Sequence, residues 1–212
     1  MDLEEKYRNY RKRQVGLHMA ILKGFVSADD YLKSAALLGI LNSNNQVVIE
    51  SKSEKDALYD FSIYGNIRAG SSALSEYIEK YPPENSEDEE LLSAMKRSDV
   101  QLYEVEDSKE DGFIKLRDPL HKTESIKIID IGLSENLNPN ILLFTRLIHL
   151  KEFSMTSGLT FAFSKNHLEY LVQKSRKMTK KFQSVDDSVD RFIAYFNLNR
   201  SNGLPVLLET VK

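Results

Sequence analysis

The side chains that could do chemistry in this sequence are four histidines, many carboxylates and a cluster of basic residues toward the C-terminus. The histidines, His18, His121, His149 and His167, do not have the spacing of metal ligands. An enzyme built on them would use His121 or His149 as its base, with an acid such as Asp118 or Asp130 beside it. The sequence contains no glycine-rich phosphate loop, no nucleophile-elbow motif and no zinc-protease motif. We therefore expect no catalytic residues, no metal and no cofactor.

A basic cluster lies on one side of a helix predicted to begin at Ser164 and to span about 164–182. Its cations are Lys174, Arg176, Lys177, Lys180 and Lys181, and the opposite side carries Leu168, Leu171, Val172, Met178 and Phe182. Such cations bind nucleic-acid phosphates because binding releases condensed counterions. They also keep a packed helix soluble without binding anything. Both interpretations stay open, and Arg8, Arg11, Lys12 and Arg13 on the first predicted helix raise the same question.

Three charged residues interrupt the apolar segments that follow residue 98, which makes them candidate binding residues. They are Arg117, Asp118 and Arg146, and the predicted loop Met155-Thr156-Ser157-Gly158 is a further candidate contact. For Arg117 and Asp118, an ion pair or a turn cap is the simpler structural explanation.

The composition excludes several protein classes. The 212 residues are 41% hydrophobic and 29% charged, which is typical of a chain that folds around a core. The absence of cysteine excludes disulfide frameworks, thiolate zinc sites and iron–sulfur clusters. The N-terminal residues lack the apolar segment of a secretory signal, and no apolar run is long enough to span a membrane. We therefore expect a cytoplasmic protein with no membrane contact.

The net charge is close to neutral, but its distribution along the chain is uneven. The 29 basic residues nearly balance the 32 acidic residues, for a net charge of −3. Residues 164–212 carry nine basic and five acidic residues, whereas the preceding segments are acidic overall. The global charge thus indicates no nucleic-acid or membrane partner, and only the C-terminal part stands out.

The spacing of apolar residues predicts a helical first half and a β-rich centre. Apolar residues recur every three or four positions over about 3–21, 28–38, 53–67, 72–81 and 86–96, with Ser27, Ser53 and Ser86 as N-cap candidates. After residue 99, alternating β-branched and aromatic residues predict short strands over about 100–105, 113–116, 126–131, 142–150 and 153–156. Helices over about 164–182 and 185–197 complete the chain.

These elements predict an α+β fold. We expect a helical region over 1–97, a small antiparallel β meander or barrel-like domain over 98–163, and C-terminal amphipathic helices with a tail over 164–212 that pack on the rest.

Several fragments also carry a family resemblance, in the same order along the chain. They include Asp60-Phe61-Ser62-Ile63-Tyr64, Leu102-Tyr103-Glu104-Val105, Leu116-Arg117-Asp118 and Thr145-Arg146-Leu147-Ile148. Over most of its length the chain resembles a family of uncharacterised bacterial proteins with an N-terminal helical region and a small β-rich domain. The sequence has Pro139-Asn140 where the family has Pro-Gly, and Asn140 can adopt the left-handed conformation that the glycine would supply. The resemblance implies this architecture and no activity.

The sequence favours a binding protein over an enzyme. We expect a non-enzymatic binding or adaptor protein that engages another macromolecule, with a protein partner or a second copy of the chain placed first. The alternative is a nucleic-acid-binding protein that uses the β domain and the basic helix 165–181. Exposed Tyr103 or Phe113 on adjacent strands would favour that alternative because bases stack on aromatic rings. An enzyme with an unfamiliar site is the third hypothesis.

Overall fold

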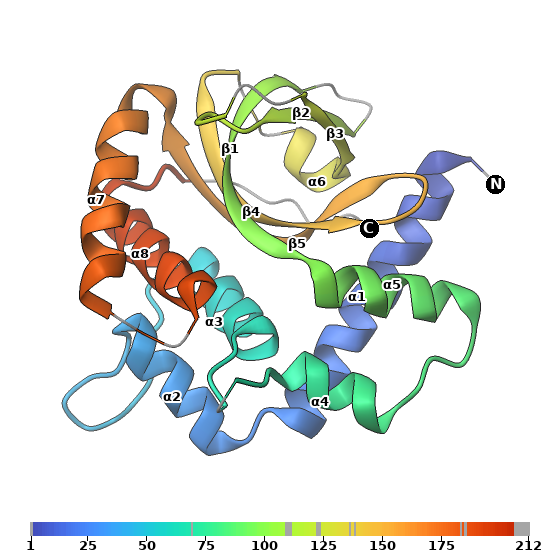
Figure 1. Cartoon of the computed structure of the whole chain (residues 1–212), viewed down its shortest axis with the longest axis horizontal. Helices are drawn as coiled ribbons and strands as arrows, with labels where there is room; N and C mark the ends of the chain where they lie inside the picture. Colours follow the sequence, from blue (N-terminus) through green and yellow to red (C-terminus); the bar gives the residue numbers. More distant parts are fainter. Residues whose placement is uncertain are drawn as a thin grey trace.

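A computed structural model describes residues 2–205, except 69, 109–111, 122–123, 136, 138, 183 and 185. Five helices precede the strands: α1 (Leu3–Phe25), α2 (Ala28–Leu38), α3 (Lys52–Tyr64), α4 (Ala73–Lys80) and α5 (Ser86–Arg97). The strands form a barrel, with α2–α5 beneath it, α1 running downward from its right side, and the C-terminal helices at its left (Figure 1). The predicted α+β fold class is confirmed.

Local sequence explains where most of these helices begin and end. Ser27 and Asp30 form a capping box at the start of α2, and Gly39 ends that helix in the left-handed conformation, with φ of +70°. The predicted caps of two other helices are wrong. Ser51 caps α3 by accepting from the N–H of Glu54, and Asn85 caps α5 by accepting from the N–H of Asp88. In each case a side chain just before the expected cap is the one that reaches a free N–H of the first turn.

The central strands close into a barrel in the order β1-β2-β3-β5-β4. They are β1 (Asp99–Ser108), β2 (Phe113–Arg117), β3 (Ile126–Ile129), β4 (Ile141–His149) and β5 (Ser154–Ser164), with the short helix α6 (Ile131–Ser134) after β3. All described pairs are antiparallel except β3 with β5, which pair in parallel at Ile128 and Ser154. The predicted barrel-like form is present, but the sheet is mixed rather than wholly antiparallel. This strand order, with a helix between β3 and β4, is that of the oligonucleotide/oligosaccharide-binding fold.

The barrel is packed on its inside and over part of its outside. Tyr103, Ile114 and Leu143 fill the interior. On the outside, Phe144 and Phe161 of β4 and β5 pack against Phe61 and Phe192 of the helices. Two-sided burial explains why β4 reads as a nearly continuous apolar run. A third cluster joins α1, α4 and α5 to the end of the barrel where β4 turns into β5.

The C-terminal part begins with a 3₁₀ turn, η1 (Lys165–His167), followed by α7 (Leu168–Phe182) and α8 (Asp187–Asn202). The expectation that Ser164 caps α7 is wrong, since the Ser164 side chain makes no capping hydrogen bond and the 3₁₀ turn intervenes. Phe182, which the sequence predicts on the apolar stripe of this helix, is 38% exposed. After α8 the N–H of Leu204 donates to the carbonyl of Ala162 on β5.

Two further observations concern single features of the sequence. Asn140 adopts the left-handed conformation with φ of +88°, so the turn before β4 keeps the geometry that a glycine would give. Among the described residues, no helix combines the length and the apolar character that crossing a membrane requires.

Candidate functional site

The five predicted cations of α7 form one exposed surface, which we call the α7 basic face. Lys174, Arg176, Lys177, Lys180 and Lys181 are all exposed, while Leu171, Val172 and Ser175 of the same helix are buried. Within the described part of the chain, none of the five has a carboxylate within ion-pair distance. Glu169 is the one acidic residue of α7, so the helix carries a net charge of +4.

This lack of partners contrasts with the arginines of α1, each of which pairs with an acid. There, Arg13 pairs with Glu87 and Asp88 of α5, and Arg8 pairs with Glu4 one turn away. An exposed aromatic ring adjoins the α7 basic face, because Tyr170 is 46% exposed and precedes Lys174 by one helical turn. The α7 basic face therefore combines uncompensated positive charge with an accessible ring.

Arg117, a predicted binding residue, lies on the outer face of the barrel in a network of ion pairs. Its guanidinium contacts Glu104 at 3.2 Å and Glu106 at 3.0 Å. Lys165 also pairs with Glu104, and the bond from its ammonium is the main cause of the lowered pKa of that carboxyl. The cations on this face are thus largely neutralised by acids of the same face.

Asp118 caps the turn after β2. One of its carboxylate oxygens accepts from the N–H groups of Leu120 and His121, and the other lies 2.8 Å from the His121 ring. Burial alone would raise the pKa of Asp118, but these hydrogen bonds outweigh burial and lower it.

The two aromatic side chains that could have stacked on bases are both covered. Tyr103 is 5% exposed and points into the barrel. Phe113 is half-buried, and the ammonium of Lys127 sits 3.6 Å from the centre of its ring. Because neither ring is freely exposed, the barrel face is a poor surface for stacking bases.

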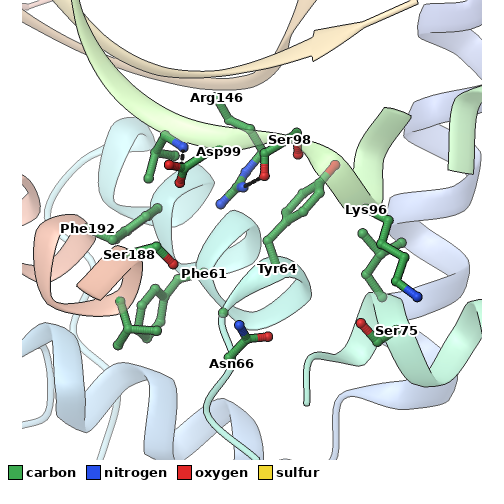
Figure 2. A pocket seen from close by; sticks show the side chains of 14 residues that line it. Phe61, Tyr64, Asn66, Ser75, Lys96, Ser98, Asp99, Arg146, Ser188 and Phe192 are labelled. Carbon is green, nitrogen blue, oxygen red and sulfur yellow. Dashed lines mark hydrogen bonds between the residues drawn. The ribbon is translucent and has the colours of Figure 1, made fainter. Parts of the chain in front are cut away.

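Arg146, the third predicted residue of the β region, is buried in the interior. Its Nε and Nη2 donate to Oδ1 of Asp60 at 3.1 and 3.0 Å, and its Nη1 donates to the carbonyl of Ser98 at 3.1 Å. The ring of Tyr64 lies 4.1 Å from the guanidinium carbon. Figure 2 shows Arg146, Tyr64 and Ser98 converging at the end of a small cavity of about 110 Å³, with Lys96 and Asn66 elsewhere on its lining. This cavity is too small for most organic ligands.

A larger cleft of about 370 Å³ lies on the other side of this ion pair, and we call it the α1–α3 cleft. Asp60 lines it, and Oδ2 of Asp60 accepts from the hydroxyl of Ser157 at 2.7 Å. The walls come from α1, α3, β5 and the junction of β3 with α6. Its volume lies within the range of small-molecule sites. The predicted contact segment 155–158 belongs to β5 rather than to a loop, and its Thr156, Ser157 and Gly158 line this cleft.

β4 pairs with one edge of β5 along this part, and on the other edge, beyond its bridge to β3, side chains of α1 take the place of a paired strand. Parallel pairing with β3 consists of one bridge at Ser154. Beyond that bridge, Nη1 of Arg11 donates to the carbonyl of Thr156 at 2.7 Å, and Nε2 of Gln14 donates to the carbonyl of Ser157 at 3.0 Å. Nη2 of Arg11 also pairs with Asp130 at 2.8 Å. The wall of the cleft is therefore held by a buried, charge-compensated network.

His18 lies on the α1 side of the same cleft. Its Nε2 is 2.9 Å from the hydroxyl of Tyr64, and burial lowers the pKa of His18 to about 4. His121 and His149, the bases considered for an enzyme, lie elsewhere: both are exposed, and Nδ1 of His149 bonds the hydroxyl of Ser154. In the described ranges, no group of three or more histidine or acidic side chains is arranged to hold a metal ion.

Sequence reasoning missed the residues that build the cleft, especially Asp60 and Gln14. One signal was available, since Gln14 shares the buried stripe of α1 with Tyr7 and Ile21. A polar residue on such a stripe indicates a buried hydrogen-bond partner. Nothing local to Asp60 indicates that its partner is Arg146.

Comparison with known proteins gives a family and no relatives of established function. A family model described as "Family of unknown function (DUF7986)" matches residues 1–209, in agreement with the expected resemblance to an uncharacterised family. No curated protein and no solved structure matches the chain.

Proposed function

We propose that this chain, which belongs to that family of unknown function, is a non-enzymatic binding protein whose α7 basic face engages a nucleic acid. The observation that carries the proposal is the absence of ion pairs on that face within the described chain. Five cations held on one helix repel one another, and a polyanion relieves that repulsion. Nucleic acids are present in the cytoplasm, the compartment expected from the sequence.

A phosphate backbone suits the face better than an isolated anion. Lys174, Lys177 and Lys181 follow one another at intervals of three and four residues, so they lie along one side of the helix. Their stripe is about 10 Å long at the helical rise of 1.5 Å per residue. Tyr170 extends the same stripe by one turn and offers a ring on which an unpaired base can stack.

The barrel contributes less to this proposal than its fold suggests. Domains with this strand order commonly bind nucleic acid on the β2–β3 side and at the β1–β2 and β4–β5 turns. Here the outward cations Lys115 and Arg117 are paired with Glu106 and Glu104. Near the β4–β5 turn, Phe153 is packed against Tyr7 and Tyr10 of α1. A shared fold is in any case no evidence of a shared function.

The test compares two variants of equal net charge. The first variant replaces four lysines of α7 by Gln: Lys174, Lys177, Lys180 and Lys181. The control replaces by Gln four exposed lysines outside α7 that have no ion pair in the described structure: Lys12, Lys23, Lys96 and Lys151. Fluorescence anisotropy with single-stranded and duplex oligonucleotides is measured from 50 to 300 mM salt. We expect the first variant to bind weakly, with the slope of log K against log salt reduced by about 3. The control keeps most of the affinity of the unmodified protein.

Three outcomes would overturn this proposal. The first is equal loss of binding in both variants, which would mean that only the total charge matters. The second is the absence of measurable oligonucleotide binding by the unmodified protein at low salt. The third is stronger binding to acidic lipid vesicles than to oligonucleotides, which would assign the α7 basic face to a different polyanion.

A protein partner, placed first from the sequence, is the second candidate function, and a separate observation favours it. Val15 and Met19 of α1 are 54% and 49% exposed and lie one helical turn apart. Replacing both by Ser should abolish capture of a nuclease-resistant partner from host lysate. The matched control replaces Leu32 and Leu37 of α2, which are 37% and 38% exposed, by Ser. Capture that survives in the α1 variant would contradict this candidate.

A further inference from the structure

The α1–α3 cleft contains polar groups that the protein itself does not satisfy. Thr160 of β5 is 6% exposed and lines the cleft, and its hydroxyl makes no hydrogen bond within the described chain. Asp56 of α3 is half-buried, also lines the cleft, and is likewise without a hydrogen bond or ion pair among the described residues. Burial raises the pKa of Asp56, although Lys52 and Lys55 oppose that effect. The hydroxyl of Thr160 is not among the fully buried atoms of the described chain that lack a partner, so it reaches the space of the cleft, and a bound molecule can approach both groups.

These groups lie on one side of the cleft, and the opposite side is already satisfied. Arg11 compensates Asp130, and Arg146 compensates Asp60. These residues fix the shape of the cleft and have little capacity left for a charged ligand. Asp56 and Thr160 also line an adjoining cavity of about 180 Å³, so these two residues lie at the boundary between that cavity and the α1–α3 cleft.

The charges of the cleft select against both kinds of ion. Asp130 pairs with Arg11, Asp60 pairs with Arg146, and Lys52 acts on Asp56, so the lining has no uncompensated positive charge to attract an anion. Lys52 and Lys55 next to Asp56 disfavour a cation, since both act on that carboxyl. A carboxylate accepts hydrogen bonds but donates none, so the ligand must bring donors.

The remaining lining suits a ring with one apolar face. Tyr59 of α3 lines the cleft near Asp56, and Leu159 and Val15 add apolar surface from β5 and α1. Gly158 has φ of +100° and nothing within 4 Å of where a Cβ would lie, so the wall stays open at that point. A ring with hydroxyl groups on one side and C–H groups on the other would place its hydroxyls against Asp56 and Thr160 and its C–H groups against the apolar side chains.

We propose that the α1–α3 cleft binds a neutral polyhydroxylated molecule of monosaccharide size, whose hydroxyl groups donate to Asp56 and bond the hydroxyl of Thr160. This site is separate from the α7 basic face and does not depend on the proposed nucleic-acid binding.

The experiment screens the full-length protein by saturation-transfer NMR against neutral and charged compounds of similar size. The neutral set contains glucose, galactose, mannose, ribose and inositol, and the charged set contains glucuronate, glucose 6-phosphate and glucosamine. We expect at least one neutral compound to bind and to exceed its charged analogues in affinity. Asp56→Asn and Thr160→Val should each weaken that binding by about tenfold or more. Asp29→Asn on exposed α2 and Thr179→Val on α7 serve as matched controls and should leave it unchanged.

The Thr160→Val variant distinguishes a loss of polyol binding from a loss of folding stability. Because the hydroxyl of Thr160 has no partner within the described chain, its removal should leave the thermal midpoint unchanged or raise it. The four-lysine α7 variant should bind the polyol normally. The proposal is overturned if no neutral polyol binds at 10 mM, if a charged analogue binds more tightly than its neutral parent, or if Asp56→Asn binds as the unmodified protein does.

Discussion

Asp60 on α3 and Arg146 on β4 form an ion pair across 86 residues of sequence, in which Nε of Arg146 donates to both carboxylate oxygens and Nη2 donates to Oδ1. Their side chains are 3% and 8% exposed. The pair joins the N-terminal helices to the barrel and separates the small cavity beside Tyr64 from the α1–α3 cleft. Arg146, a candidate binding residue from the sequence, therefore belongs to a buried ion pair that joins two parts of the fold.

Removing one member of this pair should be strongly destabilising. Asp60→Asn leaves the guanidinium of Arg146 buried without a counter-charge, which costs about 3–5 kcal/mol of unfolding free energy. Glu4→Gln, which breaks the exposed pair of Glu4 with Arg8, should cost less than about 0.5 kcal/mol. Urea denaturation of both variants checks the contrast. Replacing both members, as Asp60→Leu with Arg146→Met, should recover much of the loss, and a double variant as unstable as Asp60→Asn would contradict this account.

Arg11 should matter far more than its neighbour Arg8 on the same helix. Arg11→Met keeps the apolar stem but leaves Asp130 unpaired and the carbonyl of Thr156 without its donor. We expect a loss of about 3–4 kcal/mol, against less than about 0.5 kcal/mol for Arg8→Met. Hydrogen exchange should show the Arg11→Met loss concentrated in β5 near residues 156–160. Uniform loosening of the whole barrel would argue that Arg11 does not act at the β3–β5 seam.

His18 should make the protein less stable as the pH falls from about 6.5 to about 4. Its pKa in the folded protein is about 4, below the ordinary value of 6.5. In that window the unfolded chain binds a proton at His18 and the folded chain does not, so acid favours unfolding. The loss amounts to at most roughly 3 kcal/mol and does not grow further once both states are protonated. NMR titration of the ring and unfolding curves at pH 7, 6 and 5 test this. His18→Gln should flatten the pH dependence, and a ring pKa near 6.5 would refute the prediction.

Two glycines with positive φ should respond differently to alanine. At Gly112, with φ of +87°, a Cβ would lie 2.9 Å from Cγ1 of Ile131. At Gly39, with φ of +70°, a Cβ would meet nothing within 4 Å. Gly39→Ala pays only for the left-handed conformation, about 1 kcal/mol, whereas Gly112→Ala adds a steric clash and should cost about 2–4 kcal/mol. Thermal unfolding of the two variants measures the difference, and equal losses would show that Ile131 moves aside freely.

The sequence by itself determined the features that depend on neighbouring residues. The period of apolar residues located the helices and the strands, and Ser27 with Gly39 marked both ends of α2. The exposed position of the α7 cations also followed from the helical period, because Leu171 and Val172 must face the core. The caps of α3 and α5 were misplaced by one or two residues, since several polar residues adjoin each helix start and local sequence does not rank them.

Only the tertiary structure decided which distant residues meet. The parallel contact of β3 with β5, the pairing of Asp60 with Arg146 and the placement of Arg11 against β5 all join segments far apart in the chain. Period and propensity describe how a residue sits on its own element, but they do not specify which element lies opposite. Arg117 and Arg146 show the consequence. Both interrupt apolar strands in the sequence, yet the barrel exposes the first to acids on its outer face and buries the second beneath α3.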